Sequence, residues 1–253
     1  IDNRKVEYVN CNICDSNSSD TIWVKDGFSY QVCKKCELIY ISPRLTKEEI
    51  GNIYDIGFQS KNEGKPIPID FSSYKIFFKT AKVYRKNNLL LDVGCFRGDF
   101  LYGAKKQGWD VRGVEISSDA ADYGKKHYGL DIFKGRLMDS KFPDNFFDVV
   151  TLFDVIEHLT NPDECLKEVN RILRPGGLLY LDTPNFNSIN RIIFKKKWSV
   201  FFPWHLYYFS PKTLEKIVQN NNFYVQKLYN IDWGPISTNN VYHSLKSKNK
   251  ISK

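Results

Sequence analysis

From Leu89 onward, short apolar runs alternate with stretches that have the spacing of amphipathic helices. The apolar runs include LLLDV from Leu89, WDVRGVE from Trp109 and FFDVVTLFD from Phe146, and GLLYLDTPN follows the helix-like NPDECLKEVNRILRPGG. Runs of this length are typical of strands buried on both faces, and Ser117 can cap a helix over 119–128. Alternating strands and helices are typical of a parallel sheet. The pattern predicts an α/β fold with a doubly wound, Rossmann-like, mostly parallel sheet.

The pattern is weaker on both sides of this region. A helix capped by Thr46 and a second helix over residues 71–86 flank a polar loop at 57–70 that is rich in Gly and Pro. We expect these segments to form a helical linker and lid. The last twenty residues show little periodicity, so they predict no regular element.

Four of the six cysteines form two C-x2-C pairs, separated by eighteen residues. They are Cys11, Cys14, Cys33 and Cys36. Two such pairs bring four thiolates together as a tetrahedral zinc site, and four protein ligands leave no open position for catalysis. Two disulfides are the alternative, but no secretory feature favours them. We predict structural Zn²⁺, and we expect Cys95 and Cys165 to be small core residues.

The chain has 253 residues and 42% hydrophobic content, which suits one ordinary domain with a small appendage. No apolar run reaches the length of a membrane span, and no signal peptide is visible, so we expect a cytoplasmic protein. The oligomeric state is not indicated. The predicted organisation is a zinc ribbon at 1–43, a linker and lid at 44–86, a Rossmann-like domain at 87–232 with an aromatic-rich insertion at 185–210, and a C-terminal tail at 233–253.

The net charge of +8 permits an anionic partner such as a nucleic acid, a membrane surface or a phosphorylated substrate. The lysines are scattered, however, and Lys195–Lys197 is the longest basic run. No arginine-rich stripe or known RNA-binding signature is present. We therefore expect a small-molecule or glycan acceptor, with nucleic acid as the less favoured partner.

The stretch LDVGCFRGDF, at the end of the first apolar run, resembles a nucleotide-binding turn with the spacing D-x-G-x-x-x-G. The acidic Glu115 ends the next strand, 21 residues after Gly94, where a carboxylate can accept hydrogen bonds from a ribose diol. Asp92 would repel the pyrophosphate of NAD but suits an ammonium or sulfonium group. Phe96 stands where a further glycine is expected. We expect its backbone to be in the β or right-handed helical region, with its ring pointing away from the ligand.

The chain from Leu89 to about Leu228 resembles class I S-adenosylmethionine-dependent methyltransferases. The resemblance rests on LLLDVGCFRGDFL, GVEISSDAADYGKK and the long string from GRLMDSKFPDNFFDVV to LYLDTPN. CNIC and VCKKCELIYISPRLTKEEIGNIY resemble the zinc-ribbon preface of a bacterial branch that often methylates sugars or other small molecules. The resemblance implies that S-adenosyl-L-methionine contacts Asp92, Gly94, Gly98, Glu115, Leu137 and Phe153, whereas Arg136 stands where the family often has an Asp for adenine.

Methyl transfer to a hydroxyl needs a base or a metal to remove the proton. His158 follows the fourth apolar run, in a D-x-x-E-H group with Asp154 and Glu157. This group resembles the E-x-x-E-H metal motif of small-RNA 2′-O-methyltransferases and ubiquinone-pathway O-methyltransferases. His205 lies in WHLYYFS, similar to a segment of deoxysugar C-methyltransferases in which a His is thought to act as base. His127 and His243 read as surface residues.

The sequence thus predicts O-methylation of a sugar, nucleotide-sugar or glycan hydroxyl, with His205 as general base. A catalytic Mg²⁺ or other divalent metal at Asp154, Glu157 and His158 is a further hypothesis. The stretch from Trp198 to Phe209 has seven aromatic residues in twelve, which is typical of core but also of a substrate wall. An RNA methyltransferase, acting on a 2′-hydroxyl or a base, and a non-catalytic cofactor-binding scaffold are the alternatives.

Overall fold

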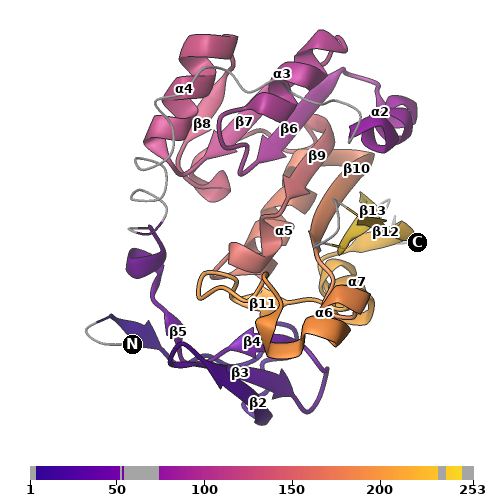
Figure 1. The fold of residues 1–253 in the computed structure, drawn as a ribbon. Helices are drawn as coiled ribbons and strands as arrows, with labels where there is room; N and C mark the ends of the chain where they lie inside the picture. The colour runs from indigo at the N-terminus through magenta and orange to yellow at the C-terminus, as the bar shows by residue number, and fades with distance from the viewer. Residues whose placement is uncertain (1–3, 52, 54–73, 233–237, 247–253) are drawn as a thin grey trace.

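The computed structural model describes residues 4–51, 53, 74–232 and 238–246. Its main sheet has the strand order β12-β13-β10-β9-β6-β7-β8, and the five strands from β10 to β8 in that order are parallel (Figure 1). The strands are β6 (Leu89–Val93), β7 (Asp110–Glu115), β8 (Ile132–Lys134), β9 (Phe147–Phe153), β10 (Leu173–Pro184), β12 (Phe223–Asp232) and β13 (Thr238–Lys246). The predicted Rossmann-like parallel sheet is confirmed.

Helices cover both faces of this sheet, because neighbouring residues along each strand point to opposite sides. On β9, Val149 packs in the cluster that contains α2, α3 and α4, and Val150 packs in the cluster that contains α5 and α7. The helices are α2 (Lys75–Ala81), which continues as η2 (Lys82–Tyr84), α3 (Asp99–Lys106), α4 (Ser118–Tyr128), α5 (Pro162–Ile172) and α7 (Pro211–Asn220). This arrangement is the predicted double winding.

Side-chain caps fix where the helices begin beside the sheet. Ser117 accepts a hydrogen bond from the Ala120 amide at the start of α4, as its position in the sequence predicted. Asn161 caps α5 by accepting from the Glu164 amide, and a proline occupies the first turn. The first cap lies just after strand β7 and the second just after the 3-10 helix η4 (Ile156–His158), so they set the backbone that borders the carboxyl end of the sheet.

Strand β13 falls in the segment that the sequence left as a weakly patterned tail. It pairs antiparallel with β10 on one side, where Leu178 faces Leu245, and with β12 on the other, where Phe223 faces Lys246. This strand is defined by its hydrogen bonds to the two neighbouring strands. The periodicity of its own sequence therefore gives little indication that a strand forms here. The predicted loop at 57–70 lies outside the described residues, and the helix expected over 71–86 is described from Lys75.

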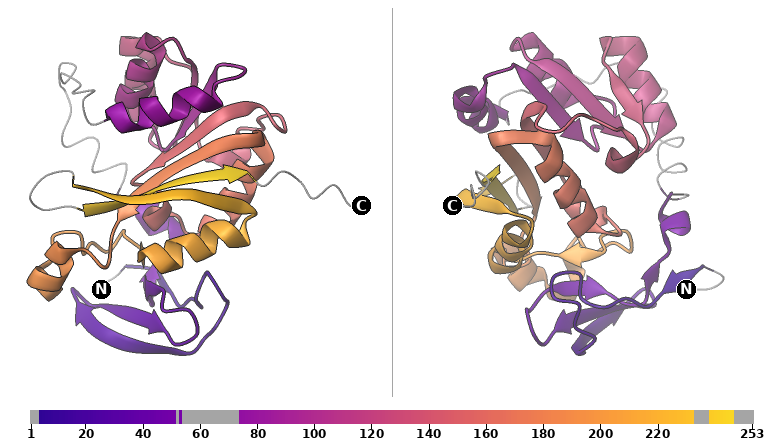
Figure 2. Two further views of the ribbon diagram at one scale, coloured as in Figure 1. Left: turned by 90° about the vertical axis from the view of Figure 1, so that its right-hand side faces the viewer. Right: turned by 180° about the vertical axis from the view of Figure 1, so that it is seen from behind.

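The N-terminal segment forms a second, four-stranded sheet with the order β11-β4-β3-β2, at one end of the molecule beside α7 (Figure 2). Its strands are β2 (Ser19–Lys25), β3 (Phe28–Cys33), β4 (Ile39–Ile41) and β11 (Tyr207–Tyr208), while β1 (Val6–Glu7) pairs with β5 (Arg44–Leu45). Three strands come from the cysteine-rich segment, but β11 comes from the aromatic insertion, where Tyr207 faces Tyr40.

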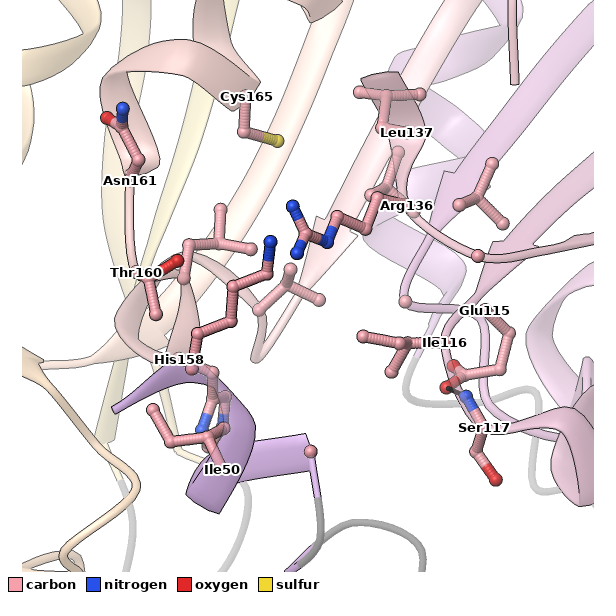
Figure 3. A pocket seen from close by; sticks show the side chains of 18 of the residues that line it. Ile50, Glu115, Ile116, Ser117, Arg136, Leu137, His158, Thr160, Asn161 and Cys165 are labelled. Atoms are coloured by element: carbon pink, nitrogen blue, oxygen red, sulfur yellow. Dashed lines mark hydrogen bonds between the residues drawn. The ribbon is translucent and has the colours of Figure 1, made fainter. Parts of the chain in front are cut away.

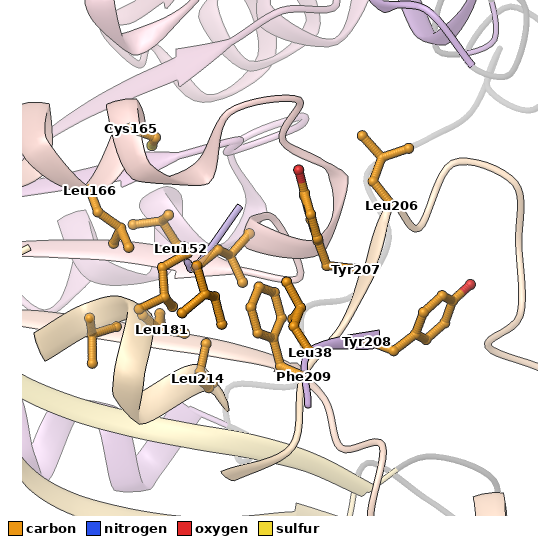
Figure 4. Packing of buried hydrophobic residues seen from close by; sticks show 14 of the residues in the cluster. Leu38, Leu152, Cys165, Leu166, Leu181, Leu206, Tyr207, Tyr208, Phe209 and Leu214 are labelled. Atoms are coloured by element: carbon orange, nitrogen blue, oxygen red, sulfur yellow. The ribbon is translucent and has the colours of Figure 1, made fainter. Parts of the chain in front are cut away.

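One buried cluster joins the two sheets. Leu38 of the N-terminal segment, Leu181 of β10 and Leu214 of α7 all belong to it, and Phe209 lies among them (Figure 4). Each of these four side chains is fully buried. Leu38 shares this cluster with the main sheet, so the N-terminal sheet is packed as part of the core. Burying each side chain of this size contributes about 1.5–3 kcal/mol. The aromatic insertion is therefore largely core, one of the two interpretations of its sequence.

Candidate active site

A cavity of about 580 Å³ opens at the carboxyl ends of the parallel strands (Figure 3). One wall comes from the ends of β6 and β7, including Gly94 and Glu115, and from Arg136 and Leu137 after β8. The opposite wall comes from residues 154–161, the start of α5 and Trp204. Lys47 and Ile50, from the helix that follows Thr46, close a third side. Ligands of doubly wound sheets bind at this edge.

The turn after β6 requires two glycines. Gly94 has a φ of +73° and Gly98 a φ of +78°, values that residues with a side chain rarely adopt. A Cβ on Gly94 would lie 2.6 Å from a methyl of Val155, and a Cβ on Gly98 would lie 2.3 Å from a methyl of Leu130. Gly94 brings the turn's backbone to the cavity, whereas Gly98 packs against Leu130 and is not among the described lining residues, so its predicted contact with the cofactor stays a prediction.

Phe96 differs from its expected conformation. Its φ is +50°, in the left-handed region that costs a residue with a side chain about 1–2 kcal/mol. The Phe96 amide donates to Glu115 Oε2 over 2.8 Å, and this charge-assisted hydrogen bond offsets the cost. The prediction of an ordinary backbone conformation was wrong, because the turn must point this amide at the carboxylate. Phe96 lines the cavity and is 45% exposed.

Glu115 is held at both oxygens. Oε2 accepts from the Phe96 amide and Oε1 accepts from the Ser117 amide, each over 2.8 Å. The residue is only 7% exposed, and burial raises the pKa of its carboxyl although these backbone bonds oppose the shift. Each oxygen retains a second lone pair, so the group can still accept hydroxyl hydrogen bonds from the cavity side. Its position fits the predicted ribose contact.

Asp92 lies beneath the same turn, at the penultimate position of β6. It is 3% exposed and accepts a 2.6 Å hydrogen bond from the Thr151 hydroxyl. Burial raises the pKa of Asp92 to about 7; the Thr151 bond opposes this shift and the charge of Glu115 adds to it. A cationic ligand at Gly94 would favour the ionised form. Asp92 is not among the described residues that line the cavity, so its predicted contact with the cofactor stays a prediction.

The remaining cofactor candidates occupy different places. Arg136 and Leu137 line the cavity, and the Arg136 side chain extends across it (Figure 3). Phe153 is not among the described residues that line the cavity. Its ring lies 4.8 Å from that of Phe100 and 5.6 Å from that of Tyr180, in an aromatic cluster against α2 and α3. Phe153 therefore packs against α2, α3 and β10, and its predicted place beside the cofactor stays a prediction.

The acceptor side of the cavity is marked by His158. Its Nδ1 lies 3.0 Å from the Trp204 carbonyl oxygen, which can only accept, so Nδ1 carries the proton and Nε2 is the basic nitrogen. Of the two histidines proposed for catalysis, His158 lines the cavity and His205 does not. The His205 ring lies behind it, with its centroid 4.5 Å from that of His158 at an angle of 85°.

Burial controls the charge of this group. It lowers the pKa of His158 to about 4 and the pKa of His205 well below its ordinary value, so both imidazoles are neutral at pH 7. It also raises the pKa of Glu157 well above the usual range, and the charge of nearby Asp154 adds to this shift. The pKa of Asp182 is raised well above its ordinary value by the same two causes, burial and the charge of Asp154. Burial thus favours the neutral forms of Glu157, His158 and His205, whereas Asp154 supplies negative charge beside them.

Glu157, His158 and His205 offer ligand atoms that all lie within 4.8 Å of one another. Glu157 Oε2 accepts from Thr183, but Glu157 Oε1 and His205 Nδ1 are buried and have no hydrogen-bond partner among the described residues. Two buried polar atoms without a hydrogen-bond partner, in a group whose ligand atoms converge, fit a divalent cation. One carboxylate with two imidazoles suits a transition metal or zinc better than Mg²⁺. Asp154 lines the cavity but is outside this group.

The four paired cysteines converge in the N-terminal sheet. Cys11 Sγ lies 3.3 Å from Cys36 Sγ, and Cys14 Sγ lies 3.5 Å from Cys33 Sγ. A disulfide is about 2.05 Å long, so all four are free thiols. Zn–S bonds of about 2.3 Å place tetrahedral sulfurs about 3.8 Å apart, and all four lie within 4.8 Å of one another. The cluster is compatible with a structural zinc ion.

Hydrogen bonds connect this N-terminal sheet to the acceptor wall. The Leu206 amide donates to the Glu157 carbonyl oxygen over 2.8 Å, and the Leu206 carbonyl accepts from the Ile41 amide over 3.0 Å. The Tyr207 hydroxyl accepts from Arg44 over 2.7 Å and donates to the Thr160 carbonyl over 3.3 Å. The η4 segment and the residues that follow it are thus held by Leu206 and Tyr207, which hydrogen-bond in turn to Ile41 and Arg44.

Several lining residues were not predicted from the sequence. Ile116 and Ser117 follow directly after Glu115, and Trp204 precedes His205, so adjacency to a predicted residue was an available signal. Lys47 and Ile50 come from a helix that is remote in sequence; it falls in the segment expected to be a linker and lid, but neither residue was singled out. In the part of the chain that the structure describes, no helix is both long and apolar enough to cross a bilayer.

The fold and this site define an α/β protein with a cavity bordered by an acidic strand end and a glycine turn. The sequence model of one family, described as a methyltransferase domain, matches residues 75–228, more than half of the 253 residues. The chain therefore belongs to the methyltransferase domain family.

Three similar proteins illustrate the range of the match. The ubiquinone biosynthesis O-methyltransferase of Colwellia psychrerythraea is 26% identical over 138 residues, 51% of this chain and 56% of that enzyme. The demethylmenaquinone methyltransferase of Symbiobacterium thermophilum is 32% identical over 132 residues, 47% of this chain and 53% of that enzyme. The chain thus spans about half the length of these relatives. The structure of a SAM-dependent methyltransferase from Methanosarcina mazei has a TM-score of 0.60 at 18% identity, covering 69% of this chain and 98% of that one, which shows the shared fold.

Proposed function

We propose that this chain transfers the methyl group of S-adenosylmethionine to a hydroxyl of a small-molecule acceptor. The observation that carries the proposal is one cavity that reaches from Glu115 at one wall to His158 at the other. A cofactor at the first wall and a hydroxyl at the second would face each other in a single space. In-line methyl transfer requires this arrangement.

The first wall supplies the groups that S-adenosylmethionine needs. Glu115 accepts the ribose hydroxyls, and the turn at Gly94 admits the methionine part above Asp92. The carboxylate of Asp92 attracts the ammonium and sulfonium groups, for which its buried position is suited. Arg136 and Leu137 border the space left for adenine. When bound, the cofactor supplies an activated methyl group.

On the second wall, His158 removes the proton of the acceptor hydroxyl. As the O–CH₃ bond forms and the S–CH₃ bond breaks, the proton passes to Nε2 of the neutral imidazole. The bond from Nδ1 to the Trp204 carbonyl oxygen orients the ring for this step. We assign this role to His158 rather than to His205, which was the base expected from the sequence, because His205 lies behind it. His205 instead supports the ring of His158.

A divalent cation held by Glu157, His158 and His205 is a second way to activate the hydroxyl. Such an ion would lower the pKa of a bound hydroxyl. The two orphaned atoms of Glu157 and His205 support this assignment. Isothermal titration with Mn²⁺ tests it directly: Glu157→Gln and His205→Ala should both abolish binding, and binding that survives both changes excludes the site.

The lining near His158 favours a flat apolar acceptor over the sugar that the sequence suggested. Ile50, Ile53, Val155, Leu159 and Trp204 form much of this region. Apolar walls with few polar groups suit an aromatic ring carrying a hydroxyl, such as a phenol or a quinol. The printed names of the two curated relatives refer to ubiquinone and menaquinone, and they support the same choice.

The experiment is cofactor titration followed by a methyl-transfer screen. We expect S-adenosylmethionine to bind, Glu115→Gln to weaken it about tenfold through one lost charged acceptor, and Glu164→Gln, at the cavity edge, to change it little. Labelled methyl groups should pass to phenolic acceptors in preference to nucleotide sugars or RNA. Failure of the cofactor to bind would contradict the proposal, and preferential labelling of sugars or RNA would contradict the acceptor class.

His158→Ala tests the base. It should lower kcat by about 10²–10⁴-fold and leave the affinity for S-adenosylmethionine unchanged. With the pKa of His158 at about 4, the wild-type rate should stay level from neutral pH down to about pH 5 and fall below that. A variant with undiminished kcat would remove His158 from the reaction.

A further inference from the structure

A short helix beyond the active site presents bare apolar side chains. The helix α6 (Ile189–Phe194) is followed by η5 (Lys195–Lys197), and together they lie at the edge of the molecule (Figure 2). Ile189 is 72% exposed, Ile192 55%, Ile193 64% and Phe194 49%. Soluble proteins rarely collect four large apolar side chains on one exposed turn and a half without a use for them.

This element is held firmly from below. Ser188 caps α6 by accepting from the Arg191 amide, and Arg191 Nε donates to the Phe186 carbonyl oxygen over 2.7 Å. The Arg191 guanidinium also stacks 4.2 Å from the Phe186 ring. Trp198, directly after η5, is 1% exposed and anchors the segment in the core. The apolar side chains are therefore displayed by a supported helix.

We propose that this element attaches the protein to the surface of an anionic lipid membrane. The α6 patch consists of Ile189, Ile192, Ile193, Phe194 and the three lysines Lys195–Lys197. Apolar side chains beside a basic cluster are the pattern of segments that lie in the membrane interface. The isoleucines and Phe194 enter the boundary between headgroups and acyl chains, while the lysines contact acidic headgroups.

The charge of the patch argues against other occupants. In a symmetric dimer across α6, the two Lys195–Lys197 clusters would lie near each other and repel. A nucleic acid would satisfy the lysines but leave the isoleucines in water. An anionic bilayer complements both halves of the patch, and the net charge of +8 adds to the attraction.

The patch adjoins the acceptor wall along the chain. Phe202, which is 38% exposed, stacks on Trp204 at 4.9 Å, and Trp204 lines the cavity. If the acceptor is an apolar ring, as proposed above, a membrane-bound enzyme would meet it where it partitions. Access to an apolar acceptor at the membrane rests on the proposed function, whereas the membrane attachment does not.

Co-sedimentation with vesicles tests the proposal. We expect the full chain to bind vesicles of phosphatidylcholine with phosphatidylglycerol and to bind pure phosphatidylcholine much more weakly. Replacing Lys196 and Lys197 with Gln should lower the partition coefficient roughly 25-fold, because each lysine contributes about fivefold. The matched control replaces the exposed Lys125 and Lys126 of α4 with Gln, and it should have little effect.

A second variant separates charge from apolar contact. Ile192→Gln with Ile193→Gln should lower vesicle binding by more than tenfold and leave the thermal unfolding midpoint unchanged, because both side chains are exposed. Equal binding to both vesicle types, or equal loss in the Lys125 and Lys126 control, would overturn the proposal. So would a dimer that the isoleucine variant dissociates, or RNA binding in place of vesicle binding.

Discussion

Replacing Asp92 with Asn is expected to stabilise the folded chain and to weaken its binding of the cofactor. Asp92 is 3% exposed, and burial raises its pKa from 3.8 to about 7. Between these two pH values the folded state binds more protons than the unfolded state. Stability therefore falls as the pH rises through this window, and the full cost is present above pH 7.

The size of the effect follows from the shift. A difference of about three pKa units corresponds to about 4 kcal/mol near pH 8, at 1.36 kcal/mol per unit. Near pH 5 the folded carboxyl is protonated, and the cost is only about 2 kcal/mol. The Asn side chain does not titrate, and its oxygen can still accept from the Thr151 hydroxyl. The advantage of the variant should thus double, from about 2 to about 4 kcal/mol, between these conditions.

Urea unfolding of both proteins near pH 5 and near pH 8, followed by tryptophan fluorescence, measures this advantage. The exposed Asp119→Asn is the matched control and should show no such pH dependence. Calorimetry should show that Asp92→Asn binds S-adenosylmethionine more weakly, because the attraction to its cationic groups is lost. An advantage that is equal at both pH values would refute the account of a buried carboxyl that is neutral in the absence of ligand.

Cys36→Ser removes one ligand of the cysteine cluster and should abolish bound zinc in elemental analysis; full zinc content in this variant would contradict the assignment. Tyr207→Phe removes the hydroxyl between Arg44 and the Thr160 carbonyl and should cost about 1–3 kcal/mol in thermal unfolding, because a buried guanidinium loses its acceptor. An unchanged midpoint would show that the bridge is dispensable. Gly124→Ala would place a Cβ 2.7 Å from the Arg97 carbonyl oxygen and should destabilise the chain by about 1–3 kcal/mol; a gain in stability would mean that α4 shifts freely.

The link between the cysteine-rich sheet and the acceptor wall has a functional consequence. Ile41 and Leu206 join that sheet to the backbone of Glu157 through two consecutive hydrogen bonds. A change that loosens the sheet should therefore disturb the group formed by Glu157 and His158. The cysteine cluster lies in this sheet, so its position makes it a support of the candidate active site.

The sequence determined the parts of this protein that depend on local pattern. Apolar runs and caps such as Ser117 were sufficient to predict the parallel sheet and its helices, because burial on both faces imposes a recognisable composition. The positions of Asp92 and Glu115 at strand ends followed from the same pattern, since parallel strands bring their carboxyl ends to one edge. The cysteine pairs likewise came together as their spacing predicted.

Tertiary structure alone decided the rest. The two-residue strand β11 exists because the distant β4 pairs with it, and β13 is completed by pairing with β10 as well as with the preceding β12. Phe96 adopts a left-handed conformation because its amide must reach Glu115. His158 rather than His205 faces the cavity because Leu206 is fixed between Ile41 and Glu157, which holds His205 behind the wall. Each outcome depends on contacts between residues far apart in the chain, where pattern and spacing have no influence.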